Sequence, residues 1–154
     1  MSAELMNKIV MNNALIPREN LIVGGQPSID DLRLLKEQGV ESIVNLRQAT
    51  EPNAYDEAIV AQQLGFSYYH IPLSDISTFT IEAAQSLKEV LDQNRPCLVH
   101  CATGNRVGAL IALVAFWLEG HKAEHAIELG LQSGLTIFQP QVTALMQQSN
   151  IHSH

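Results

Sequence analysis

A cysteine, a glycine and an arginine stand close together in the segment VHCATGNRVGAL, which begins at Val99. Cys101 directly follows an apolar run, Gly104 comes soon after it, and Arg106 opens a long apolar stretch. A cysteine thiolate is a nucleophile, and glycine allows a backbone to wrap closely around an anion. The planar guanidinium group of arginine pairs two donors with two oxygens of an oxyanion. These residue types at this spacing therefore predict a thiolate–anion site.

The elements around this segment predict where the thiol lies. Residues 96–100 form a short apolar run typical of a central strand, and a buried helix is expected from about Arg106 to Gly120. Ligands of open α/β sheets bind at the carboxyl ends of the strands, and the amino end of a helix favours negative charge. Both effects favour the thiolate form of Cys101. The loop amides are expected to form an anion nest from Ala102, Thr103, Gly104, Asn105 and Arg106.

The rest of the chain alternates strands with helices. Strands are predicted over 20–25, 41–47 and 66–73, and helices over 29–38, 54–64, 81–93, 123–132 and 139–148. Ser28 and Thr80 are the expected amino-terminal caps of two of these helices. This alternation predicts an α/β fold, with a mainly parallel central sheet flanked by helices on both faces.

Length and composition limit the possibilities further. The 154 residues predict a single domain over 1–154, with an N-terminal extension over 1–18 and a frayed tail over 149–154. The net charge of −7 argues against nucleic acid or an anionic membrane as a partner. Cys97 and Cys101 lie too far apart along one strand for a disulfide. The amino terminus carries no cleavable signal pattern, so a cytoplasmic location is expected.

The segment around Cys101 resembles the signature of the cysteine-dependent protein tyrosine and dual-specificity phosphatases. Two further segments, GGQPSIDDLRLLKEQGVESIVNLR and FSYYHIPLSD, resemble the opening elements and the general-acid strand of the small bacterial members, so the likeness covers most of the chain. Within that superfamily the chain is similar to the phosphatase-like domain of the beta-lactamase-hydrolase-like family. The resemblance implies a protein-tyrosine-phosphatase-like fold and hydrolysis of a phosphomonoester without metal or cofactor.

The same resemblance implies a role for each matching residue. Cys101 is the nucleophile that forms a cysteinyl-phosphate, and Arg106 and the loop amides hold the phosphate oxygens. His100 orders the loop and tunes the thiol. Asp75, which follows the segment IPLS, is the candidate acid that protonates the leaving group. A residue of a surface turn is an equally good interpretation of this aspartate. The expected partner is a phosphorylated protein or a small phosphomonoester.

Two departures from the phosphatase signature keep other functions open. Only four residues separate Cys101 from Arg106, one fewer than is usual, and Val107 stands where a serine or threonine is common. Thr103 is the residue that could supply the missing hydroxyl. The short loop also resembles that of rhodanese-type sulfurtransferases, which would carry a persulfide on Cys101. A module that binds an anion without catalysis is the third alternative.

Structural roles are expected for the other polar residues. Arg47 is expected to be an exposed strand-end arginine. His121 and His125 could share a helix face, but without a third ligand they do not predict a metal site. Gln139 and Gln141 lie near a helix start, where capping or a surface position is expected rather than the positioning of a hydrolytic water.

Overall fold

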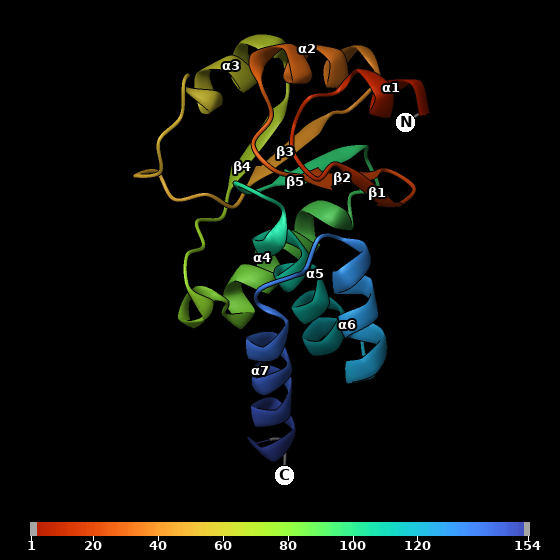
Figure 1. Ribbon diagram of the computed structural model, residues 1–154, viewed down its shortest axis with the longest axis vertical. Helices are drawn as coiled ribbons and strands as arrows, with labels where there is room; N and C mark the ends of the chain where they lie inside the picture. The colour runs from red at the N-terminus through yellow and green to blue at the C-terminus, as the bar shows by residue number, and fades with distance from the viewer. Residues whose placement is uncertain (1–2, 153–154) are drawn as a thin grey trace.

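The computed structural model describes residues 3–152, with side chains described from 4 to 148. Helices and strands alternate along most of the chain (Figure 1). Their bounds are α1 Ala3–Lys8, β1 Leu15–Arg18, β2 Leu21–Gly24, α2 Ile29–Glu37, β3 Ser42–Asn45, α3 Glu57–Leu64, β4 Ser67–His70, the 3-10 turn η1 Ile76–Thr78, α4 Ile81–Leu91, β5 Cys97–His100, α5 Asn105–Leu118, α6 Ala123–Gln132 and α7 Gln139–His152.

The strands form one five-stranded sheet in the order β1-β2-β5-β3-β4. β1 is antiparallel to β2, and the other neighbouring strands are parallel. In the central strand β5, Val99 is level with Val23 of β2 on one side and Val44 of β3 on the other. Figure 1 shows α1, α2 and α3 on one face of the sheet and α4 to α7 on the other. The predicted α/β fold with a mainly parallel sheet is confirmed.

The apolar sequence of β5 follows from its burial on both faces. Cys97 and Val99 pack with the helices α4 to α7, whereas Leu98 packs with α1 to α3. All the residues of β5 are buried. A strand covered on both faces needs apolar side chains in both directions, which gives a continuous run instead of an alternating one. This position fixes the carboxyl end of β5, and hence Cys101, at the centre of one edge of the sheet.

Local capping signals place the helix starts that the sequence predicts. The Ser28 hydroxyl accepts a hydrogen bond from the Asp31 amide at 3.0 Å, and the Asp31 carboxylate accepts one from the Ser28 amide at 3.0 Å. Thr80 caps α4 in a similar way, accepting from the Ala83 amide at 3.2 Å. α3 begins at Glu57, three residues later than predicted, because Asp56 accepts from the Ile59 amide and so acts as the cap.

The segment expected as an N-terminal extension belongs to the body of the fold. β1 adds an antiparallel edge to β2, and Leu5 and Met11 are buried in the core beneath α2 and α3. The Val10 amide donates a hydrogen bond of 2.8 Å to the Asp31 carboxylate of α2. These long-range contacts order a segment whose own sequence carries little helical or strand periodicity.

Two further expectations concern the cysteines and the tail. Cys97 and Cys101 are both free thiols, as predicted from their spacing. The predicted frayed tail over 149–154 falls outside the side chains that the structure describes, although the α7 backbone continues to His152. Within the described residues, no helix combines the length and the apolar character needed to cross a membrane.

Candidate active site

Cys101 lies where the sequence placed it, directly after β5 and before α5. Its side chain is 1% exposed. The Gly104 amide donates a hydrogen bond of 3.0 Å to Cys101 Sγ. Gly104 has a φ of 97°, in the left-handed region that favours glycine, and it is the residue from which α5 begins. Gly104 therefore has the left-handed backbone that turns the loop around the thiol.

The loop carbonyls bond outward, toward the N-terminal part of the chain. The Ala102 carbonyl accepts from the Gln26 amide at 3.3 Å, and the Thr103 carbonyl accepts from Asn13 Nδ2 at 2.7 Å. In a trans peptide the N–H of the next residue points opposite to the carbonyl. The Thr103 amide therefore points away from Gln26, and the Gly104 amide points away from Asn13 and donates to the thiol, as a donor of an anion nest would.

The Asn105 side chain faces away from this nest and ties it to another loop. Asn105 Oδ1 accepts from the Thr136 amide at 2.9 Å, from the Thr136 hydroxyl at 3.1 Å and from the Phe138 amide at 3.4 Å. Any contribution of Asn105 to anion binding must therefore come from its backbone amide. The loop between α6 and α7 is held closely against the cysteine loop by these contacts.

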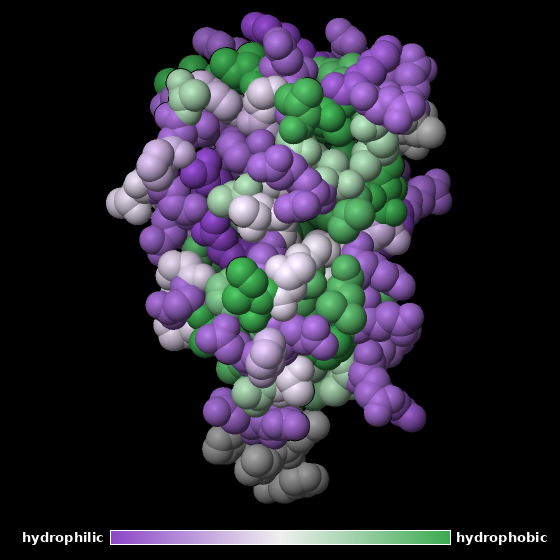
Figure 2. Space-filling view, viewed as in Figure 1, coloured by the Kyte–Doolittle hydropathy of each residue, from purple (hydrophilic) through white to green (hydrophobic). Residues whose placement is uncertain are grey.

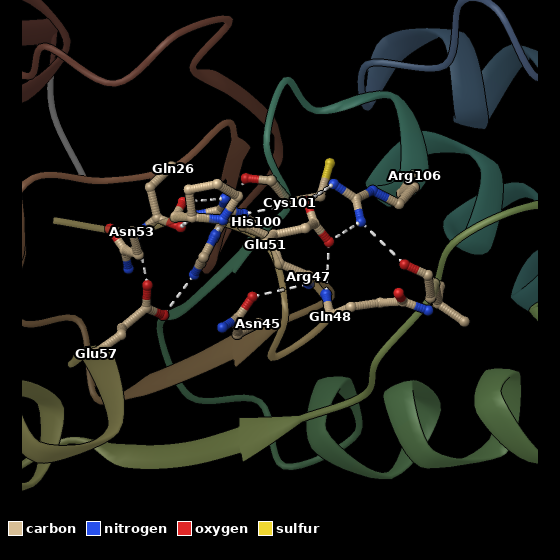
Figure 3. A network of polar contacts seen from close by, with 12 residues as sticks. Gln26, Asn45, Arg47, Gln48, Glu51, Asn53, Glu57, His100, Cys101 and Arg106 are labelled. Atoms are coloured by element: carbon tan, nitrogen blue, oxygen red, sulfur yellow. Dashed lines mark hydrogen bonds and ion pairs between the residues drawn. The ribbon is translucent and has the colours of Figure 1, made fainter. Parts of the chain in front are cut away.

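Arg106 lies in the first turn of α5 and pairs with a carboxylate that sequence analysis did not single out. Its Nη1 lies 2.7 Å from Glu51 Oε2, and its Nη2 lies 2.8 Å from Glu51 Oε1 (Figure 3). Nη1 also donates to the Leu73 carbonyl at 2.9 Å. The hydrogen bonds from Arg106 lower the pKa of Glu51 to about 2, and the same pairing raises the pKa of Arg106. The two-pronged contact fixes the direction of the guanidinium group.

His100 is buried directly before the cysteine, as its place in β5 predicts. Its Nε2 lies 2.5 Å from Glu57 Oε2, and its Nδ1 lies 3.3 Å from the Cys101 carbonyl oxygen. The other oxygen of Glu57 accepts from Gln26 Nε2 at 2.6 Å. Neither Glu57 nor Gln26 was a predicted site residue. Glu57 follows the capping residue Asp56, and Gln26 precedes Pro27. Both patterns indicate local structure and give no sign of a functional site.

The expectation that Arg47 is exposed is wrong, because this residue is 8% exposed. Its guanidinium group donates to Gln26 Oε1 at 2.6 Å and to the Pro52 carbonyl at 2.7 Å, and its Nε lies 3.4 Å from Glu51. β3 is an inner strand of the sheet, so the chain that follows it folds back over the strand end. Glu51 thus lies between two arginines, Arg47 and Arg106.

Asp75 lies on the surface as the cap of η1. Its carboxylate accepts a hydrogen bond from the Ser77 amide at 2.9 Å and another from the Ser77 hydroxyl. These bonds lower the pKa of Asp75, so the carboxylate form is favoured. The chain just before it reaches the site, because the Leu73 carbonyl contacts Arg106. Asp75 therefore has the surface-turn position that the sequence also allowed, in a segment that adjoins the arginine.

A cavity of about 460 Å³ borders this polar network, and Cys101 is not among its lining residues. Polar side chains line much of it, among them Arg47, Glu51, Glu57 and His70. Figure 2 shows hydrophilic side chains gathered over the loop between β3 and α3, and hydrophobic ones over the β1–β2 hairpin. The cavity therefore adjoins the residues that support the cysteine loop, and it does not adjoin the thiol itself.

The remaining candidates stay outside the site. His121 and His125 are paired, with their Nδ1 atoms 3.1 Å apart, on the exposed surface at the start of α6. Among the described residues, no cluster of three or more His, Cys, Asp or Glu side chains could hold a metal ion. Gln139 and Gln141 are both exposed in the first turn of α7.

Comparison with known proteins places this geometry in a family. Residues 11–152 match the model of a family described as "PTP-NADK: DSP-PTPase phosphatase fused to NAD+ Kinase". The chain is 28% identical over 99 residues to a beta-lactamase hydrolase-like protein of Xylella fastidiosa (strain Temecula1), a match that covers 62% of this chain and 23% of that protein. A beta-lactamase hydrolase-like protein of Agrobacterium fabrum is 29% identical over the same length, with the same coverage. The chain thus spans about a quarter of the length of these relatives.

Solved structures share the fold. A DUF442 protein from Shewanella putrefaciens CN-32 superposes with a TM-score of 0.71 and 20% identity, covering 96% of this chain and 98% of that one. Kinase associated phosphatase superposes with a TM-score of 0.69 and 20% identity, covering 95% and 97%. A cysteine loop between a central strand and a buried helix, on this fold, defines a protein-tyrosine-phosphatase-like protein. The chain belongs to the DSP-PTPase phosphatase family, which confirms the resemblance seen in the sequence.

Proposed function

We propose that the protein hydrolyses a phosphomonoester without a metal ion, through a phosphate group carried transiently on Cys101. The observation that carries this proposal is the hydrogen bond from the Gly104 amide to Cys101 Sγ, 3.0 Å long, at the start of α5. An amide donor and the positive end of a helix both favour a thiolate over a thiol. Arg106, held in direction by Glu51, supplies the positive charge that a phosphate needs.

The proposed reaction has two displacements at phosphorus. Cys101 Sγ first attacks, so that an S–P bond forms while the bond to the ester oxygen breaks. The loop amides and the Arg106 guanidinium group stabilise the charge on the phosphate oxygens. A water molecule then attacks phosphorus, the S–P bond breaks, and inorganic phosphate and the Cys101 thiolate are released. His100 supports the loop from within the core.

Asp75 is the proposed proton donor to the ester oxygen in the first displacement. Its loop is tied to the site through the contact between the Leu73 carbonyl and Arg106, 2.9 Å long. The bonds from Ser77 lower the pKa of Asp75, so its acid form becomes populated only as the pH falls. Turnover is therefore expected to rise toward acid pH.

Sulfur transfer is the second candidate, favoured by one observation. Only four residues separate Cys101 from Arg106, so the ring of amides has one donor fewer than is usual for a phosphate. A narrower ring suits a single sulfur atom. In this reaction the Cys101 thiolate attacks the outer sulfur of thiosulfate, forming a persulfide and releasing sulfite.

Hydrolysis of p-nitrophenyl phosphate in the presence of EDTA, between about pH 5 and pH 8, tests the proposal. The wild type is compared with Cys101→Ser and with Cys97→Ala, a matched change at the other cysteine. Turnover that is lost in the first variant and kept in the second supports the phosphatase. No turnover, together with a persulfide on Cys101 after exposure to thiosulfate, supports sulfur transfer. Phosphate binding without either reaction supports an anion-binding module.

A further inference from the structure

A buried ion pair lies directly behind the proposed nucleophile. The side chains of His100 and Glu57 are 0% and 3% exposed, and Nε2 lies 2.5 Å from Oε2. Burial of charged groups costs free energy unless each group meets its partner and its other hydrogen-bonding positions are filled. Apolar side chains of similar volume could fill the same space. The cost of burying both groups makes the pair a candidate for a role in the chemistry of the loop.

The contacts of the His100 ring determine its protonation. Nε2 faces the Glu57 carboxylate, and Nδ1 faces the Cys101 carbonyl oxygen at 3.3 Å. Carboxylate and carbonyl oxygens only accept hydrogen bonds, so each ring nitrogen must carry a hydrogen to bond its partner. An imidazole with two N–H groups is a cation. With the Glu57 carboxylate ionised, these two contacts are those of an imidazolium next to Cys101, with Glu57 as its counterion.

Glu57 is itself held in place by a chain of hydrogen bonds. Gln26 Nε2 donates to Glu57 Oε1 at 2.6 Å, and Gln26 Oε1 accepts from Arg47 Nη1 at 2.6 Å (Figure 3). The backbone amide of Gln26 donates to the Ala102 carbonyl of the cysteine loop at 3.3 Å. The chain from Arg47 to His100 thus supports the cysteine loop at two points, the carbonyls of Ala102 and Cys101.

The other titratable groups near the pair come from the neighbouring loop and strands. Burial and the Glu57 carboxylate raise the pKa values of Tyr55, before α3, and Tyr68, in β4, the latter to about 12. Both phenols are therefore neutral in the range where a phosphatase would be assayed. Arg47, at the end of β3, is the cation that reaches Glu57 through Gln26. Asp31 and Asp56 also act on these phenols, and Cys101 follows His100 directly in the chain.

We propose that Glu57 is a positioning residue, which keeps His100 as an imidazolium with a fixed ring orientation behind the Cys101 thiolate. This inference rests on the proposed function through Cys101. Without the carboxylate, a neutral His100 that still donates from Nε2 would turn the lone pair of Nδ1 toward the Cys101 carbonyl oxygen. That contact is repulsive, so the ring and the loop would shift, and the thiolate would also lose a neighbouring cation.

Alkylation of Cys101 by iodoacetamide as a function of pH, followed by mass spectrometry, tests this role without requiring turnover. Glu57→Gln keeps an acceptor oxygen and removes the charge, whereas Glu57→Asp keeps the charge. Glu82→Gln is the matched control, since Glu82 is an exposed glutamate on α4. Cys97 does not interfere, because burial raises its pKa to about 12.

In Glu57→Gln the midpoint of alkylation should rise by about one pH unit or more, since an adjacent opposite charge shifts a titration by about that amount. The kcat/KM for p-nitrophenyl phosphate at about pH 6 should fall about tenfold, because one pH unit is a tenfold change in thiolate population. Glu57→Asp should keep its midpoint close to the wild type, and Glu82→Gln should change neither quantity.

A Glu57→Gln protein that melts at a lower temperature but keeps the wild-type midpoint would overturn the inference, because the pair would then serve packing alone. If that variant does not fold, Glu57→Asp carries the test, and a full-unit rise in its midpoint would refute the role of the charge. A Glu57-dependent midpoint in a protein without phosphatase turnover would leave the positioning role standing and remove the proposed function. Turnover that depends on Cys101 but is unchanged in Glu57→Gln would support the proposed function and refute the positioning role of Glu57.

Discussion

Replacing Glu51 by glutamine should destabilise the protein at neutral pH and have little effect in acid. In the structure, Glu51 receives two hydrogen bonds from Arg106, at 2.7 and 2.8 Å, and one from the Gln48 amide at 2.6 Å. These bonds join the loop after β3 to the first turn of α5. Glutamine has almost the same shape but no charge, so it keeps the packing and loses the ion pair.

The size of the effect follows from the pKa of Glu51, which these bonds lower from 4.5 to about 2. The difference, 4.5 minus about 2, corresponds to about 3.4 kcal/mol in the free energy of unfolding if water does not screen the pair. The Glu51 side chain is 25% exposed, so part of this energy is screened. We therefore expect the substitution to cost about 1–2 kcal/mol at pH 7.

The sign of the pH dependence is set by which state binds the proton more tightly. Folding lowers the pKa of Glu51, so the unfolded chain takes up the proton first. The stabilisation is therefore complete above about pH 4.5 and is lost as the pH falls through about 2. About half of the difference between wild type and variant should be gone near pH 3.3.

Urea unfolding followed by the fluorescence of the single tryptophan, Trp117, measures this difference. The wild type, Glu51→Gln and the exposed control Glu82→Gln are compared at pH 7 and near pH 3.3. Equal stability of the wild type and Glu51→Gln at pH 7 would refute the reasoning. So would a deficit that stays constant down to the acid limit, because it would then come from packing and not from the charge.

Two other changes have outcomes that the structure determines. Gly108→Ala should lower the free energy of unfolding by about 1–3 kcal/mol or more in the same urea assay. The reason is that an added Cβ would lie 2.0 Å from the Leu135 amide nitrogen. A variant as stable as the wild type would contradict the close packing of α5 against the end of α6. Asp75→Asn should reduce turnover of phenyl phosphate by about a hundredfold and abolish its rise toward acid pH, while p-nitrophenyl phosphate, with its better leaving group, is affected less. Equal losses on the two substrates would rule out Asp75 as the proton donor.

Much of the fold could be predicted from the sequence because the relevant signals are local. The capping box of Ser28 and Asp31 and the cap at Thr80 act within one turn of a helix. The apolar run of β5 indicates a strand buried on both faces. The packing of the N-terminal segment could not be predicted from its sequence, because it comes from distant contacts, such as the one between the Val10 amide and Asp31.

The sequence by itself determined the reactive loop. Cys101, Gly104 and Arg106 are neighbours in the chain, so the strand, the turn and the helix start that arrange them are encoded in one short segment. Only the tertiary structure decided what surrounds that loop. Glu51 and Glu57 stand 55 and 43 positions away from the residues that they pair with. Those pairs depend on β3 lying beside β5 in the sheet, and strand order is a non-local property that no local spacing of residues specifies.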